Sequence, residues 1–126
     1  MDLIDRLPGI GNKVGAGKYF VVSMINKKID SSYKKAIANF SVLGMGLESG
    51  VPIPKVVAIC EKFFKENKKE AEFSEEMCRA LNSLFGRIEL GEFEPDDGVW
   101  VKDFVLPYLK NRQRALKVAV IKKTLR

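Results

Sequence analysis

Few side chains in this sequence could do chemistry, and the densest group of them is acidic. Glu92, Glu94, Asp96 and Asp97 fall within the seven residues EFEPDDG. Carboxylates so close together could attract a divalent cation, but their spacing does not match that of an EF-hand calcium loop. A carboxylate in this kind of position more often caps the first turn of a helix. We therefore expect residues 92–98 to form a loop in which Asp96 or Asp97 caps the next helix, and we expect no metal ion there.

Other catalytic chemistry lacks its usual residues. The sequence contains no histidine, which is the commonest general base and a common zinc ligand. Cys60 and Cys78 lie within apolar helical stripes, as reduced core thiols of a cytoplasmic domain do. No nucleophile, base and orienting group occur together in a pattern that suggests a catalytic set. We expect neither an enzyme nor a bound cofactor.

The glycine-rich stretch LPGIGNKVGAGK, near the start of the chain, is similar to two phosphate-binding motifs. A phosphate-binding loop needs glycine at position 12 and serine or threonine at position 19, where this chain has Asn12 and Tyr19, so we exclude it. The segment from Leu7 to Gly11 resembles the hairpin of helix-hairpin-helix DNA-binding proteins, whose backbone amides bind a phosphate. Only six residues precede Leu7, which is too few for the helix that this motif requires.

Two apolar stripes with helical spacing must position whatever the chain presents to a partner. The first consists of Ala36, Phe40, Leu43 and Leu47, and the second of Ile53, Val56, Val57, Cys60, Phe63 and Phe64. Between them, Gly50 can take the left-handed conformation that closes a helix, and Pro52 and Pro54 suit the start of the next helix. Two helices joined by so short a turn should pack antiparallel.

The rest of the chain is also helical in pattern, with no strand alternation. We expect a first helix over about residues 32–47, with Asp30 or Ser31 as its N-cap, and a second over residues 54–67. A third helix should start after a cap at Ser74. A last helix should run from Val99 or Trp100 to the end, with a kink or break at Pro107. Residues 1–30 would form an N-terminal arm with a short helix at about 18–27, and residues 31–126 would form the main domain. The predicted fold class is all-α, a compact antiparallel helical bundle of five to six helices.

The formal net charge of the 126 residues is +6, and the basic residues gather toward the end of the chain. They are Lys110, Arg112, Arg114, Lys117, Lys122, Lys123 and Arg126, and no acidic residue follows Asp103. Such a run is typical of nucleic-acid binding, of an anionic membrane surface, of the cytoplasmic flank of a membrane span, or simply of a solvated helix face. No apolar run reaches the roughly 18–20 residues that a membrane-spanning helix needs.

The order of these motifs resembles one known family. Glu48-Ser49-Gly50-Val51-Pro52-Ile53 stands between two apolar helices, Gly91-Glu92 follows a third, and Tyr108-Leu109-Lys110 leads into a basic helix. This pattern is similar to the first cytoplasmic domain of the type II secretion F and type IV pilus inner-membrane platform family, and the departures after Glu92 suit its type IVb branch, such as the toxin-coregulated or bundle-forming pilus systems. In the resemblance, Gly50, Val51, Pro52, Gly91 and Glu92 are structural turn residues.

The resemblance implies a structural, non-enzymatic role at the cytoplasmic face of the bacterial inner membrane. The expected partners are the assembly ATPase, other platform proteins and a second copy of the domain, and the chain would be cut before a transmembrane helix. The exposed charged residues that could face a partner are Glu61, Lys62, Lys65, Glu66, Glu92, Glu94, Asp96 and Asp97. The alternative is a small basic nucleic-acid-binding protein that uses residues Leu7 to Gly11 and the basic helix. We expect nucleic acid to be the less suitable partner.

Overall fold

The computed structural model describes the chain from residue 14 to residue 125, and the side chains from residue 21 to residue 123. Within this range the chain is all-helical and contains no strand. Its helices are α1 (Val14–Ser49), α2 (Pro54–Asn67), α3 (Glu75–Glu89), α4 (Pro95–Trp100), the π-helical segment η2 (Val101–Val105) and α5 (Leu106–Leu125). Because α4, η2 and α5 follow one another without a gap, the described residues form four continuous helical runs. The predicted all-α class is confirmed.

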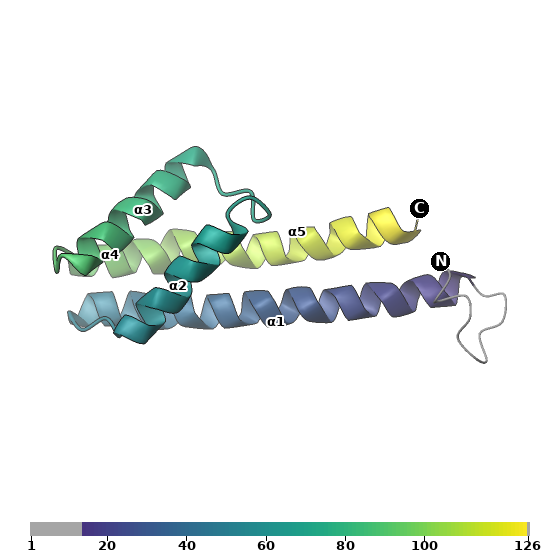
Figure 1. Ribbon diagram of the computed structural model, residues 1–126, viewed down its shortest axis with the longest axis horizontal. Coiled ribbons are helices and arrows are strands. Elements are labelled where there is room, and N and C mark those ends of the chain that lie inside the picture. Colours follow the sequence, from purple (N-terminus) through teal and green to yellow (C-terminus); the bar gives the residue numbers. More distant parts are fainter. Residues whose placement is uncertain (1–13, 126) are drawn as a thin grey trace. The chain divides into compact units, whose positions relative to one another are not determined.

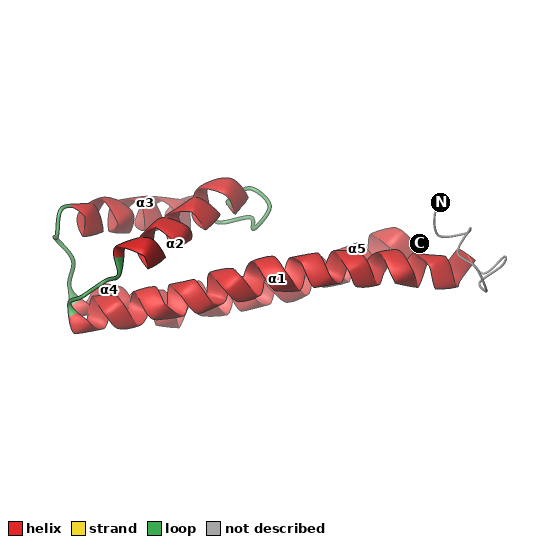
Figure 2. Ribbon diagram, turned by 60° about the horizontal axis from the view of Figure 1, so that its bottom comes forward, coloured by secondary structure: helices red, strands yellow, loops and turns green. Residues whose placement is uncertain are grey.

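The helices divide into two compact units. Unit 1 contains the described part of α1 up to Tyr33 and the part of α5 from Asn111, and these two segments run side by side in opposite directions (Figure 1). Unit 2 is Lys34–Lys110. Within unit 2, α2 and α3 also run in opposite directions and are joined by a short loop (Figure 2).

Helix α1 does not break where the sequence predicts. The expected short helix at residues 18–27 and the N-cap at Asp30 or Ser31 are wrong, because α1 continues from Val14 to Ser49. Its buried side chains alternate at spacings of three and four, as in a coiled-coil seam, and half-buried Asn26 continues the same spacing. They are Val22, Ile29, Tyr33, Ala36, Phe40, Leu43 and Leu47. The predicted stripe is therefore the second half of a longer one.

In unit 1, Asp30 accepts hydrogen bonds instead of capping a helix. Its Oδ1 atom lies 2.9 Å from Gln113 Nε2 and 2.9 Å from Lys117 Nζ, both on α5. Both interactions link residues more than eighty positions apart in the chain, so no local pattern could indicate them. They explain how a polar residue can stand inside α1 without ending it.

Aromatic residues fill the core of unit 2. Phe40 of α1 meets Phe63 of α2 edge-to-face, with ring centroids 6.5 Å apart. Phe64 contacts Phe73 and Phe85 at 5.7 and 6.2 Å. Burying each such side chain contributes about 1.5–3 kcal/mol, so this cluster dominates the stability of the unit.

The stripe predicted for the second helix is buried only in part. Cys60, Phe63 and Phe64 are buried, Val56 and Val57 are half-buried, and Ile53 is exposed. The gradient runs from the buried C-terminal half of α2 to its open N-terminal half. The apolar side chains of that open half are therefore available to a further partner.

Three helices end in the same kind of turn, in which one residue has a positive φ. Gly50 has φ +79°, and the amides of Gly50 and Val51 donate to the carbonyls of Leu47 and Gly46. Gly91, with φ +73°, closes α3 in the same way, as predicted for both glycines. At the end of α2 the position is held by Glu72, with φ +53°, a conformation that an L-residue adopts at a cost.

The helical run after Glu94 starts earlier than predicted and passes through Pro107. Its first segment, α4, begins at Pro95, so the prediction of a loop over residues 92–98 and of a start near Val99 is wrong. Of the kink or break expected at Pro107, the break is absent, since α5 extends from Leu106 to Leu125. A proline ring clashes with the carbonyl four residues before it. The wider π turn at Val101–Val105, where the Leu106 amide donates to the Val101 carbonyl, lies where that clash would occur.

Candidate functional site

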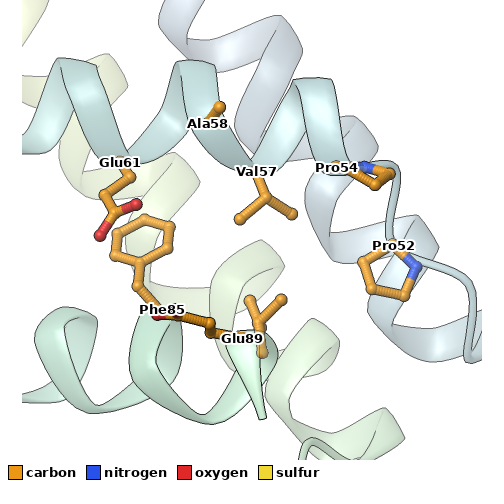
Figure 3. A pocket seen from close by; sticks show the side chains of 8 residues that line it. Pro52, Pro54, Val57, Ala58, Glu61, Phe85 and Glu89 are labelled. Carbon is orange, nitrogen blue, oxygen red and sulfur yellow. The ribbon is translucent and has the colours of Figure 1, made fainter. Parts of the chain in front are cut away.

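An open groove in unit 2, lined mainly by apolar residues, lies beside part of the predicted partner surface. It has a volume of about 510 Å³ and lies between the first half of α2 and the second half of α3. Figure 3 shows Val57 pointing from α2 toward α3 and Phe85 pointing back toward α2, with Pro52 and Pro54 at one end. The residues that line it are Pro52, Pro54, Val57, Ala58, Glu61, Phe85, Ile88 and Glu89.

The turn chemistry of the chain creates this groove. Proline at the first position of α2 has no N–H to leave unpaired, and the left-handed Gly50 ends α1 just before it. Gly46 allows the chain to fold back closely, because a Cβ atom there would lie 3.0 Å from Pro52 Cα. The predicted turn residues Gly50, Val51 and Pro52 therefore fix the position from which the two prolines close the groove.

Large apolar side chains stand exposed around the same turns. Val51 is 69% exposed and Ile53 50%, and Leu90, at the end of α3, is 71% exposed. Single exposed apolar residues are ordinary, but these flank or immediately precede the segments that line the groove. An apolar groove with exposed apolar neighbours is the kind of surface that takes a helix or an extended peptide.

Two carboxylates give the groove its charge. Glu61 lines it from α2 and Glu89 from α3. Glu61 also forms an exposed ion pair with Lys65, with 3.3 Å between Oε2 and Nζ. An exposed pair of this kind contributes at most about 1 kcal/mol, so a partner's cation can replace Lys65 at little cost.

The predicted partner surface divides into two groups in the structure. Glu61, Lys62, Lys65 and Glu66 lie on α2, where Lys62 and Glu66 are exposed. Of the acidic group, Glu92, Glu94 and Asp96 are exposed. Only Glu61 of these eight lines the groove.

Asp97 serves the fold instead of standing free for a partner. Its two carboxylate oxygens accept from the Arg87 guanidinium at 2.8 and 3.0 Å, and Oδ2 also accepts from the Glu94 amide at 2.9 Å. Hydrogen bonding to Arg87 holds the pKa of Asp97 below its usual value, and the same bonds raise the pKa of Arg87. Asp97 was predicted to cap a helix that starts near Val99, but the N-cap of α4 is Glu94, and Asp97 contributes to the capping box from the third helical position.

The acidic segment and the cysteines offer no reactive site within the described residues. Among residues 14–125, no three His, Cys, Asp or Glu side chains are grouped so that they could hold a metal ion. Cys60 is fully buried, and burial raises the pKa of its thiol to about 12. Its thiolate is therefore negligible near neutral pH. Cys78 is half-buried, and its Sγ donates weakly to the Phe73 carbonyl at 3.9 Å.

The hairpin-like segment from Leu7 to Gly11 lies outside the described residues, so its prediction stays open. Within residues 14–125, no helix has both the length and the apolar character that crossing a bilayer requires. Comparison with known proteins adds no constraint, since no protein-family model, no curated protein and no solved structure matches the chain.

The groove itself was not predicted from the sequence. No local signal indicates it, because the six residues of the α2 stripe share one face of ordinary width for a surface helix. α3 covers the C-terminal half of that face, and the groove lies beside the N-terminal half.

Proposed function

We propose that this chain is a non-enzymatic docking domain of an inner-membrane platform protein in a type IV pilus or type II secretion machine. Its partners would be the assembly ATPase and neighbouring platform proteins, at the cytoplasmic face of a bacterial inner membrane. The proposal includes a compact antiparallel bundle of five to six helices, the larger number if α4, η2 and α5 are counted separately. The observation that supports it most is the groove beside the Ser49-Gly50-Val51-Pro52 turn.

The mechanism of such a domain is mechanical. A partner that binds the groove contacts α2 and α3 together, and the aromatic core ties both helices to α1. A closely packed core transmits displacement because it deforms little. Movement of a docked ATPase would therefore reach α1 and α5 as movement of the whole unit, and a second copy of the domain could present the same groove to another subunit.

Direct binding to the assembly ATPase of the same organism tests the proposal. The purified chain is immobilised, and the affinity for the ATPase is measured by biolayer interferometry. Ala58→Glu places a charged side chain at an exposed position of the groove and should weaken binding at least tenfold. Lys69→Gln changes the net charge by the same amount at an exposed position after α2, outside both the groove and the predicted partner surface, and should leave the affinity unchanged. Absence of wild-type binding, or equal effects of both variants, would overturn the proposed docking site.

A second candidate function is nucleic-acid binding, which the concentration of basic residues favours. The segments 14–33 and 111–125 contain eight Lys or Arg residues and one acidic residue. Binding through several phosphates is tight at low salt and falls steeply as salt rises. Titration of duplex DNA at about 50 mM salt decides this alternative, because negligible affinity even there would remove it.

A further inference from the structure

The part of α5 in unit 1 has an outer face that nothing in the proposed docking function uses. Val118 is 49% exposed and Ile121 39%, and the neighbouring Ala115 and Ala119 are exposed as well. Arg114 lies one turn before Val118, and Lys122 lies one turn after it, both exposed. Because residues three and four apart share a helix face, these six residues form one surface, which we call the α5 stripe.

The charge around the α5 stripe is almost entirely positive. In the described part of unit 1, residues 14–33 and 111–125, the sequence has eight basic residues and a single carboxylate, Asp30. That carboxylate is already engaged by Gln113 Nε2 and Lys117 Nζ, each at 2.9 Å. The stripe therefore has apolar side chains at its centre and cations at both ends, and within residues 14–33 and 111–125 the single carboxylate is already engaged.

We propose that the α5 stripe binds the surface of an anionic lipid bilayer. Val118 and Ile121 would enter the interface between headgroups and acyl chains, and Arg114 and Lys122 would extend their charged ends to the lipid phosphates. Helices that lie in this interface combine an apolar face with lysine and arginine beside it. Each basic residue near an anionic leaflet adds to the attraction, and the attraction falls off within a Debye length.

Two other occupants fit the α5 stripe less well. A nucleic acid would use Arg114 and Lys122 but would leave Val118 and Ile121 against a charged phosphate backbone. A second copy of the stripe would bring the same cations face to face, and the six residues of the stripe include no carboxylate to pair with them, which is repulsive. The lipid surface is the occupant that satisfies both the apolar centre and the basic ends. This inference does not depend on the proposed docking function, because it concerns a different unit and a different partner.

The test is co-sedimentation of the purified chain with vesicles. One set of vesicles contains phosphatidylcholine alone, and the other contains equal parts of phosphatidylcholine and phosphatidylglycerol. We expect at least tenfold tighter binding to the anionic vesicles at 100 mM NaCl, and loss of that preference at 500 mM NaCl. Equal binding to both vesicle types would overturn the proposal.

Matched variants locate the binding surface. Val118→Asp should weaken binding to anionic vesicles at least tenfold. Val51→Asp makes the same chemical change at an exposed position of unit 2 and should lower the affinity for these vesicles less than twofold. If Val118→Asp unfolds the chain by circular dichroism, the double variant Arg114→Gln with Lys122→Gln replaces it. Its control is Lys55→Gln with Lys62→Gln on α2. Equal losses for a variant and its control would overturn the assignment to α5.

Duplex DNA serves as the competing probe in the same buffer. Vesicle binding that is unaffected by DNA at equal phosphate concentration supports the lipid surface. Displacement from the vesicles by DNA, together with DNA binding that Val118→Asp does not weaken, would make the stripe a phosphate-binding surface and overturn the proposal.

Discussion

Units 1 and 2 use charge in opposite ways. Unit 2 contains eleven basic and thirteen acidic residues, and ion pairs such as Arg87 with Asp97 and Lys102 with Glu48 link its helices. The described part of unit 1 contains eight basic residues and one acidic residue. Unit 2 also holds the aromatic core, whereas the buried side chains of unit 1 on α1 are Val22, Ile29 and Tyr33.

This difference predicts that the two units differ in resistance to unfolding. A core of packed aromatic rings with nearly balanced charge favours unit 2. A helix pair with few buried side chains and one sign of charge gains stability from an anionic partner or from higher salt, because both reduce the repulsion between its cations. Variants that act on one unit should therefore have separable effects.

The largest effect is expected at Gly98, where two helices of unit 2 approach too closely to admit a side chain. A Cβ atom at Gly98 would lie 2.3 Å from the Gly44 carbonyl oxygen and 2.7 Å from Glu48 Cγ. Gly98→Ala should lower the free energy of unfolding by about 2–3 kcal/mol, because backbone must move. Gly86→Ala, which has nothing within 4 Å, should raise it by about 1 kcal/mol through helix propensity. Urea denaturation followed by circular dichroism measures both, and equal values would contradict the close approach.

The Arg87–Asp97 pair gives unit 2 a predicted pH dependence. Because the pKa of folded Asp97 is lowered, its contribution to stability is full above its unfolded pKa of about 4 and is lost as pH falls through the lowered value. Asp97→Asn should cost on the order of 1–2 kcal/mol at pH 7, a range that allows for solvent screening of the part-exposed Arg87.

As pH falls below about 4, the cost of Asp97→Asn should shrink, because the wild-type carboxylate takes up a proton as pH passes through its lowered pKa. Asp96→Asn, at an exposed neighbouring position, is the control and should show a much smaller loss. Thermal unfolding from pH 2.5 to pH 7 separates the two variants, and a cost that does not change with pH would show that the ion pair does not matter.

In unit 1, the seam contains a polar residue that weakens it. Asn26 continues the apolar spacing of α1, and its Oδ1 atom is buried without a hydrogen-bond partner in the part of the chain that the structure describes. Asn26→Leu should raise the stability of unit 1 by about 1 kcal/mol, since it removes an unsatisfied polar group from the seam. Hydrogen exchange of the α1 amides before Tyr33 is the measurement. Ser23→Leu, at an exposed site, should leave the exchange rates of these amides unchanged.

The smallest effect is expected at the end of α2. Glu72 has φ +53°, so Glu72→Gly should raise the free energy of unfolding of unit 2 by about 0.5–1 kcal/mol by relieving backbone strain. The Glu72 carbonyl, which accepts from the Tyr108 hydroxyl, is kept in this variant. Lys69→Gly, whose φ is not positive, should bring no gain. A loss for Glu72→Gly in chemical denaturation would show that the side chain matters more than the strain.

Local features of the chain were predictable from the sequence. The bounds Pro54–Asn67 of α2 and the Ser74 cap, whose Oγ accepts from the Met77 amide at 3.1 Å, agree with the prediction. Gly50 and Gly91 take the predicted left-handed conformation. These features depend on residues within one turn of each other, so a short window of sequence contains all the information.

The errors arose where distant partners override a local preference. Asp30 is a good helix N-cap by itself, but Gln113 and Lys117 bind its carboxylate, and α1 continues. Asp97 was expected to cap a helix that starts near Val99, but it lies at the third position of α4, where Glu94 is the N-cap. Its pairing with Arg87 was not predicted, because no sequence pattern links two positions ten residues apart across a turn. The groove was missed because it depends on how much of α2 the second half of α3 covers.

By itself, the sequence determined that the chain is helical, where α2 begins and ends, and which glycines close helices, because propensity, capping and φ preference act over three or four residues. Only the tertiary structure decided that α1 is continuous, that Gly98 must lack a side chain, and that an apolar groove stays open beside Val57. These features depend on contacts between segments tens of residues apart. The free energy of such contacts can exceed the local helix and capping preferences from which a helix end at Asp30 or a loop at Gly98 was predicted.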